Sequence, residues 1–236
     1  LNEILLLMQL NFLLSNFNSI CFVWIGVAVA TFCLLQFVTA PFGRHASDSW
    51  GPTINNKTGW VLFEIVSLIA FVLSSGLLWT TSNNHLNSCQ LIVAASWTMH
   101  YIHRSLIYPL NTKTTDSRMP LIVVVAATLF NTVNGFLNGI AISNSAHNTP
   151  LFIIGFVVFV FGMIFNMKYD YYLISLRTNG EIKQYKIPEI ELFSLVSCAN
   201  YTAELLEWFG YCLMAQHWAA ISFFVWTLAN LVPRAR

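Results

Sequence analysis

The chain has 236 residues, of which 56% are hydrophobic, 15% aromatic and only 9% charged. A soluble domain carries roughly 25% charged residues, so this composition excludes a water-soluble protein with an ordinary polar surface. The formal net charge of +1 gives no sign of a nucleic-acid-binding protein, and no nucleic-acid signature appears in the sequence.

Seven apolar stretches are long enough to cross a bilayer, which takes about 20 residues. In chain order they are residues 17–40, 59–80, 88–110, 119–143, 148–168, 193–214 and 216–232. The first 14 residues are also apolar, and they either lengthen the first span or lie along the membrane interface. We therefore predict an all-α, polytopic membrane protein: a bundle of seven transmembrane helices forming a single domain over residues 1–236.

Basic residues alternate along this predicted bundle. The segments around the ends of the first, third and fifth spans, together with the C-terminal end, hold ten of the eleven Lys and Arg residues. The segments after the second, fourth and sixth spans hold none. Because basic loops stay cytoplasmic, we expect the N-terminus outside and the C-terminus in the cytoplasm. The host membrane would be the endoplasmic reticulum in a eukaryote or the inner membrane in a bacterium.

Residues 169–192 form the longest connection, a polar cytoplasmic segment that is either functional or a solvated connector. The five cysteines show no CxxC spacing, which argues against structural zinc and against a disulfide framework. His100 and His103 do not have the spacing of a metal motif. We expect no metal site.

Four charged residues fall inside apolar spans: Glu64, Arg104, Glu204 and Glu207. Each costs about 2.5–3.5 kcal/mol on insertion scales, so such residues normally face a bundle interior and do chemistry, transport or pairing there. An ion pair of the last two glutamates with Arg104 or a loop Lys is one open interpretation. Glu64 has no basic residue near it in the sequence, which favours a functional role.

Polar residues also repeat at the i, i+3, i+4, i+7 spacing of one helix face. The fourth span carries the stripe Thr128, Asn131, Asn134 and Asn138. The third span carries Trp97, Tyr101, Arg104 and Tyr108, and the sixth carries Asn200, Glu204, Glu207 and Tyr211. Hydrogen bonds between helices are a sufficient explanation for the asparagine stripe, and a functional interior is the alternative.

Three blocks of residues resemble the steroid 5-alpha-reductase family of NADPH-dependent membrane reductases. The first is Pro41-Phe42-Gly43-Arg44-His45 with Gly59-Trp60 leading to Glu64, and the second is His100-Tyr101-Ile102-His103-Arg104. The third runs from Asn166 and Asp170 through Tyr185-Lys186-Ile187-Pro188 to the segment 196–211, and Pro233-Arg234 follows. The blocks keep the family's order from residue 41 to the end.

This resemblance implies a seven-helix fold, NADPH entering from the cytoplasm, and a lipophilic 3-oxo-Δ4-steroid substrate taken from membrane lipid, in a monomer. Glu64 and Tyr101 would be catalytic and would face the substrate carbonyl, with Trp97 and Glu207 also lining the substrate site. The expected cofactor contacts are Asn166, Asp170, Arg177, Tyr185, Lys186, Asn200, Glu204 and Arg234, with Arg44 and Arg118 as weaker candidates.

The chain departs from the family's pattern at three points. Glu189-Ile190-Glu191 stands where the family has Gly-Gly, and Lys186 replaces an arginine, which keeps the charge but loses forked phosphate geometry. The family also continues beyond the position of Arg236, so we expect that a C-terminal cytoplasmic tail is missing here.

The resemblance suggests a mechanism in which Tyr101 and a protonated Glu64 hold the C3 oxygen of an enone while hydride reaches C5. Donors aimed at a developing oxyanion in a dry site stabilise that transition state. An enoyl or polyprenol reductase of the same fold remains an alternative. A membrane methyltransferase, or a transporter using Glu64, Glu204 and Glu207 as a proton relay, is disfavoured because the sequence shows neither the former's C-terminal motif nor the latter's inverted repeats and broken spans.

Overall fold

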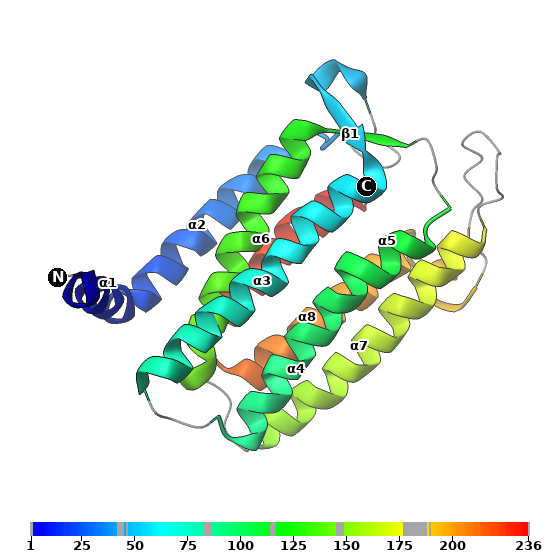
Figure 1. The fold of residues 1–236 in the computed structure, drawn as a ribbon. Helices are drawn as coiled ribbons and strands as arrows, with labels where there is room; N and C mark the ends of the chain where they lie inside the picture. Colours follow the sequence, from blue (N-terminus) through cyan, green and yellow to red (C-terminus); the bar gives the residue numbers. More distant parts are fainter. Residues whose placement is uncertain are drawn as a thin grey trace.

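The computed structural model describes residues 2–41, 45, 47–82, 86–113, 117–144, 149–176, 188 and 190–235. Long helices dominate this part of the chain and run roughly along one common direction (Figure 1). The α-helices are α1 (Asn2–Ser15), α2 (Phe17–Leu35), α3 (Asn56–Ser82), α4 (Ser88–Ile102), α5 (Tyr108–Asn111), α6 (Leu121–Ala141), α7 (Pro150–Ser175), α8 (Ala199–Ala215) and α9 (Trp218–Arg234). Short elements complete the list: η2 (Asp48–Trp50), β1 (Thr53–Asn55), η3 (His103–Ile107), β2 (Arg118–Pro120), η4 (Ile142–Asn144) and η5 (Glu191–Ser194).

Four of the described helices are long and apolar enough to cross a membrane by length and composition. They are Phe17–Leu35, Asn56–Leu77, Leu121–Ala141 and Pro150–Ser175. Their outer faces carry exposed large apolar side chains such as Val72, Leu129 and Ile164, as a lipid-facing surface requires. The prediction of a helical, polytopic membrane protein is thus confirmed.

The structure decides one boundary that the sequence left open and corrects another. The apolar N-terminal residues form a separate helix, α1, which turns away from α2 at Asn16, so they do not lengthen the first span (Figure 1). The polar segment predicted over 169–192 is wrong at its start, because α7 continues to Ser175 and keeps Tyr169 and Asp170 in its buried face.

Local signals explain several helix ends. Asn87 and Gln90 form a reciprocal capping box at the start of α4. Thr149 caps α7 with Pro150 at its first position, where a missing N–H costs nothing. The Nδ1 atom of His217 accepts a hydrogen bond from the Ala220 N–H and caps α9.

The helices pack closely in pairs: α3 with α6, α7 with α8, and α2 with α9. Glycines allow the first two contacts. A Cβ on Gly135 would meet the backbone of Ser67 in α3, and a Cβ on Gly162 would meet the backbone of Glu207 in α8. Close approach through small residues is a common way for membrane helices to associate without a hydrophobic driving force.

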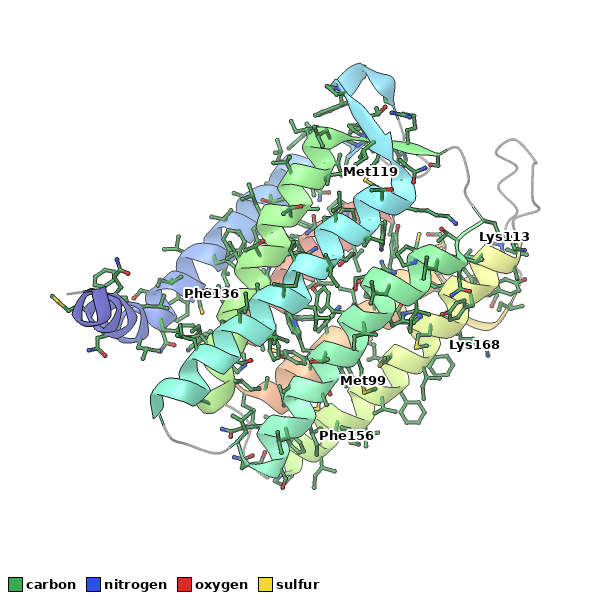
Figure 2. The ribbon with its side chains drawn as sticks, viewed as in Figure 1. Met99, Lys113, Met119, Phe136, Phe156 and Lys168 are labelled. Carbon is green, nitrogen blue, oxygen red and sulfur yellow. The ribbon has the colours of Figure 1, made fainter. Side chains whose placement is uncertain are left out.

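One end of the bundle carries a two-stranded antiparallel sheet in which Ile54 pairs with Met119. Lys113 and Lys168 lie toward this same end (Figure 2). Arg118, in β2, donates hydrogen bonds to the side-chain and backbone oxygens of Thr53, at 2.7 and 2.8 Å. Lys113, Arg118 and Lys168, which belong to the basic segments around the ends of the third and fifth predicted spans, therefore lie toward one end of the structure.

An aromatic core fills the middle of the bundle. Trp97 is fully buried at its centre and packs against Phe71, Trp208, Tyr211 and Phe223, with ring centroids 4.9 to 5.4 Å apart. Tyr101, one turn along the same helix, also contacts Trp97 at 5.0 Å. The core thus ends, in the direction of the sheet, at the tyrosine of the predicted site.

Candidate active site

The third helical run changes geometry at the candidate site. Pro109 has no N–H and its ring would crowd the carbonyl four residues earlier, so a regular α-helix cannot pass through this point unchanged. The chain instead forms a π-helical turn, η3, directly before α5, whose second residue is Pro109. Such turns often occur at functional sites. Here the carbonyl of Arg104 accepts a hydrogen bond from the Trp60 indole N–H at 3.1 Å.

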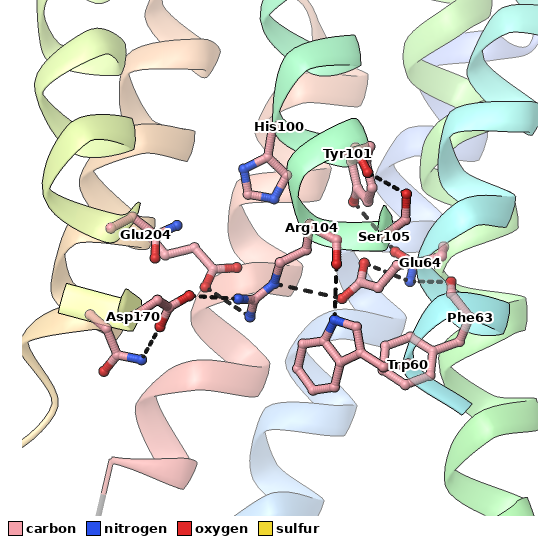
Figure 3. A network of polar contacts seen from close by, with 12 residues as sticks. Trp60, Phe63, Glu64, His100, Tyr101, Arg104, Ser105, Asp170 and Glu204 are labelled. Carbon is pink, nitrogen blue, oxygen red and sulfur yellow. Dashed lines mark hydrogen bonds and ion pairs between the residues drawn. The ribbon is translucent and has the colours of Figure 1, made fainter. Parts of the chain in front are cut away.

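The side chain of Arg104 lies at the centre of a buried ionic cluster (Figure 3). Its Nη1 donates to Oδ2 of Asp170 at 2.9 Å, and its Nη2 donates to Oε2 of Glu204 at 3.4 Å. Its Nε lies 3.8 Å from Oε1 of Glu64. The guanidinium also lies over the rings of Trp60 and Tyr108, at 4.9 and 5.0 Å, which adds cation–π attraction.

Glu64 and Tyr101 meet through a third residue, Asn131 of α6. The Asn131 amide nitrogen lies 3.4 Å from Oε2 of Glu64, and the Tyr101 hydroxyl donates to the Asn131 oxygen at 3.4 Å. All three side chains are buried, with Glu64 only 9% exposed. An acid and a phenol from different helices thus converge at one buried point.

A second buried network lies next to the first. Nδ1 of His100 is 2.7 Å from Oε1 of Glu207, and the Asn166 amide nitrogen donates to Oε2 of Glu207 at 3.0 Å. Glu207 is completely buried. The ring of His100 also packs edge-to-face on Trp208 and Tyr101. Both oxygens of Glu207 are therefore satisfied from two other helices.

The structure brings most of the described predicted site residues into these two networks. Asp170 is held on its second oxygen by the amide of Asn200 at 2.9 Å, which places Asn200 beside Arg104 and Glu204. The network members are Glu64, Tyr101, Asn166, Asp170, Asn200, Glu204 and Glu207.

Three predicted residues lie elsewhere. Arg118 is exposed in β2, and Nε of Arg234 donates to the hydroxyl of Tyr201 at 2.9 Å. Trp97 lies in the aromatic core, one turn from Tyr101. The remaining predicted cofactor residues, Arg44, Arg177, Tyr185 and Lys186, lie outside the described residues.

Two sequence interpretations need correction. An ion pair with Arg104 is confirmed for Glu204, but Glu207 pairs with His100 instead. Glu64, which has no basic neighbour in the sequence, has Arg104 as a spatial neighbour. The sequence could not predict the contact between Glu64 and Arg104, because α3 and η3 meet only in the folded bundle.

Sequence reasoning did not assign Arg104, Asn131 or Trp60 to catalysis, cofactor binding or substrate binding. Arg104 and Asn131 did stand out, one as an intramembrane charge and the other within a polar stripe. The interpretation of the stripe as helix-to-helix hydrogen bonding is confirmed for Asn134, which accepts from the Trp24 indole, and for Asn131, which donates to the Phe63 carbonyl. The Asn131 side chain also contacts Glu64 and Tyr101.

Among apolar helices, a centre with four carboxyl groups, one guanidinium and a histidine defines an integral membrane protein with an ionisable interior. Comparison with known proteins identifies it further. A sequence profile described as 3-oxo-5-alpha-steroid 4-dehydrogenase matches residues 117–236.

Curated relatives agree over nearly the whole chain. The chain is 36% identical to steroid 5-alpha-reductase DET2 of Gossypium hirsutum, covering 89% of this chain and 83% of that protein. It is 36% identical to DET2 of Solanum lycopersicum, covering 93% and 86%. It is 32% identical to 3-oxo-5-alpha-steroid 4-dehydrogenase 1 of Homo sapiens, covering 92% and 85%.

The chain therefore belongs to the 3-oxo-5-alpha-steroid 4-dehydrogenase family. The family and the enzyme class predicted from the three sequence blocks are confirmed. This membership favours a reductase over the methyltransferase and transporter alternatives.

Proposed function

We propose that this protein reduces the Δ4 double bond of 3-oxo-Δ4-steroids to 5α-3-oxosteroids, with NADPH as the reductant. The observation that carries the proposal is the convergence of Glu64 and Tyr101 on Asn131 beside a buried ionic cluster. The names of the curated relatives support a steroid substrate over an enoyl thioester or a polyprenol.

In the proposed reaction, hydride addition at C5 places negative charge on the C3 oxygen, and a proton added at C4 then restores the neutral ketone. Hydrogen-bond donors preorganised around that oxygen stabilise the transition state. Tyr101 supplies an O–H, and Glu64 supplies a second donor when it carries a proton. A steroid carbonyl bound between them would receive both hydrogen bonds.

Charge balance supports a proton on Glu64. The carboxyl groups of Glu64, Asp170 and Glu204 surround a single guanidinium, at 3.8, 2.9 and 3.4 Å respectively. Burying an uncompensated charge is costly, so one guanidinium cannot neutralise three ionised carboxylates. Glu64 is the most distant from Arg104 of the three, so in this proposal it is the first to take up a proton.

The described residues fit a nicotinamide dinucleotide. NADPH would supply the hydride for the reduction. Asn166, Asp170, Asn200 and Glu204 offer amide and carboxylate groups for ribose hydroxyls and a carboxamide, and Arg234 offers a cation for phosphate. The buried Oδ1 of Asn166 has no hydrogen-bond partner among the described residues, as expected for an acceptor that a ligand N–H would satisfy. Arg44, Arg118, Arg177, Tyr185 and Lys186 remain predicted phosphate or cofactor contacts.

The proposed membrane topology has seven spans in a single domain, with the N-terminus outside and the cofactor side in the cytoplasm. It is supported by the gathering of Lys113 and Lys168 toward the end that carries β1 and β2, where the C-terminus also lies (Figures 1 and 2). Positive residues mark the cytoplasmic side of membrane proteins. A monomer surrounded by lipid would take its steroid directly from the bilayer.

The decisive test uses purified protein in detergent, NADPH, and a panel of progesterone, testosterone, an enoyl thioester and a polyprenal. We expect 5α-reduced steroids, identified by mass spectrometry and by stereochemistry at C5, and NADPH-dependent thermal stabilisation. Reduction of only the thioester or the polyprenal would assign the protein to another branch of the fold. Absence of both turnover and NADPH stabilisation would overturn the proposal.

A further inference from the structure

We infer that Asn131 is a positioning residue that holds Tyr101 and Glu64 in register for the reaction. This inference rests on the proposed function, which assigns Tyr101 and Glu64 to the substrate carbonyl. It concerns a residue of α6, the helix that packs along α3 and that contributes neither of the two proposed catalytic groups.

The orientation of the Asn131 amide is fixed by the backbone. Its nitrogen lies 2.7 Å from the carbonyl oxygen of Phe63. A carbonyl oxygen only accepts hydrogen bonds, so the atom facing it must be the NH2 group. The amide oxygen is therefore turned to Tyr101 and the second N–H is available to Glu64.

This orientation assigns a role to each neighbour. The Tyr101 hydroxyl must act as a donor, because the Asn131 oxygen only accepts. Oε2 of Glu64 must act as an acceptor, because the Asn131 N–H only donates. A proton on Glu64 is thereby directed to Oε1, where it can be donated to a third group. The single O–H of Tyr101 is held at the Asn131 oxygen and has to turn from it to donate to a substrate carbonyl.

Burial makes the arrangement stiff. Asn131 is 3% exposed, and Gly135, one turn further along α6, lets the backbone of α3 approach closely. The Phe63 carbonyl precedes Glu64 in that same approaching segment. A displacement of about 1 Å in a catalytic group can cost about 10²-fold in rate, so this contact has a direct kinetic consequence.

The test compares Asn131→Leu with the matched control Asn134→Leu. Asn134 is equally buried on the same helix and accepts the Trp24 indole N–H, but the contacts of its side chain do not include Glu64 or Tyr101. We expect Asn131→Leu to lower kcat by about 10²-fold and to shift the pH dependence of kcat, with a smaller change in the steroid KM. Asn134→Leu should lower the unfolding temperature and leave kcat and its pH profile unchanged.

A second variant, Asn131→Asp, preserves shape if the leucine variant does not fold. Aspartate faces the Phe63 carbonyl and Glu64 with an oxygen, so it can replace the asparagine only when it carries a proton. Its activity should therefore recover toward low pH, measured relative to the wild type at each pH. The charged or titratable groups around this position are Glu64, His100, Tyr101, Arg104 and Glu204.

A double-mutant cycle of Asn131→Leu with Tyr101→Phe is read out as thermal unfolding without substrate. It tests the positioning role of Asn131 separately from the proposed steroid reduction. Non-additive unfolding shifts support the coupling even if the wild type reduces no steroid, in which case only the proposed function fails. Wild-type kcat and pH profile in Asn131→Leu, or fully additive shifts in the cycle, would overturn the positioning role.

Discussion

Nη1 of Arg104 lies 2.9 Å from Oδ2 of Asp170, although the two residues are 66 positions apart in the sequence. This ion pair joins the π-helical turn η3 to the last turns of α7. It also brings together two of the three blocks of residues that resemble the reductase family. The guanidinium is the one cation that any of the described carboxylates Glu64, Asp170 and Glu204 meets in a salt bridge.

Replacing Arg104 by methionine should destabilise the protein strongly. Removing one partner from a buried ionic cluster leaves uncompensated carboxylates and costs on the order of 3–5 kcal/mol. Arg104→Lys should cost less, since it keeps the charge but loses the forked donors and ring stacking. Thermal unfolding in detergent measures both effects, and Lys113→Met, at an exposed position just after α5, is the control. Equal stability of Arg104→Met and the control would contradict the central role of the guanidinium.

Glu64→Gln and Tyr101→Phe should each slow hydride transfer with little effect on folding. Tyr101→Phe removes one donor to the developing oxyanion, which typically costs about 10²–10³-fold in rate. Glu64→Gln replaces the acidic O–H by a weaker amide N–H donor, so its loss of rate should be smaller. Single-turnover oxidation of NADPH, followed by absorbance, measures the step directly. Tyr108→Phe, which changes a tyrosine stacked on Arg104, is the control. Undiminished hydride transfer in both site variants would remove the proposed oxyanion role.

Asp170→Asn should weaken NADPH binding more than steroid binding. The carboxylate accepts from both Arg104 and Asn200, and an amide in its place cannot accept on both sides without turning one N–H toward a donor. We expect at least a tenfold increase in the dissociation constant for NADPH, about 1.4 kcal/mol, measured by titration. Weaker steroid binding with unchanged NADPH affinity would instead place Asp170 in the steroid site.

Gly162→Ala should destabilise the packing of α7 on α8. A methyl group there would meet the backbone of Glu207, which cannot move aside as a flexible side chain can, so a cost of about 1–3 kcal/mol is expected. Gly26→Ala in α2 is the matched control, because a Cβ there meets no heavy atom within 4 Å. By helix propensity the control should stabilise slightly, by up to about 1 kcal/mol. Thermal unfolding of the two variants should therefore move in opposite directions.

The overall architecture of this fold could be predicted from the sequence, whereas some helix ends and local turns could not. Apolar length alone predicted the helical membrane architecture. Capping residues such as Asn87 and Thr149 begin helices in the structure, a signal that the prediction did not use. The prediction missed that α7 runs on through Asp170, because polarity alone was taken as the end of the span. The π-helical turn has a signal in Pro109, but its effect on the Arg104 carbonyl depends on Trp60 of another helix.

For the site, the sequence indicated which polar residues face the interior of the bundle but could not pair them. Spacing put Tyr101, Glu204 and Asn131 on interior faces, because a charge or an amide among apolar residues must avoid lipid. The partners were decided in three dimensions: Arg104 with Glu64, His100 with Glu207, and Asn131 between Tyr101 and Glu64. Helical periodicity shows which residues share a face of one helix. Which faces come together depends on which helices can approach closely, and glycines such as Gly135 and Gly162 allow that approach.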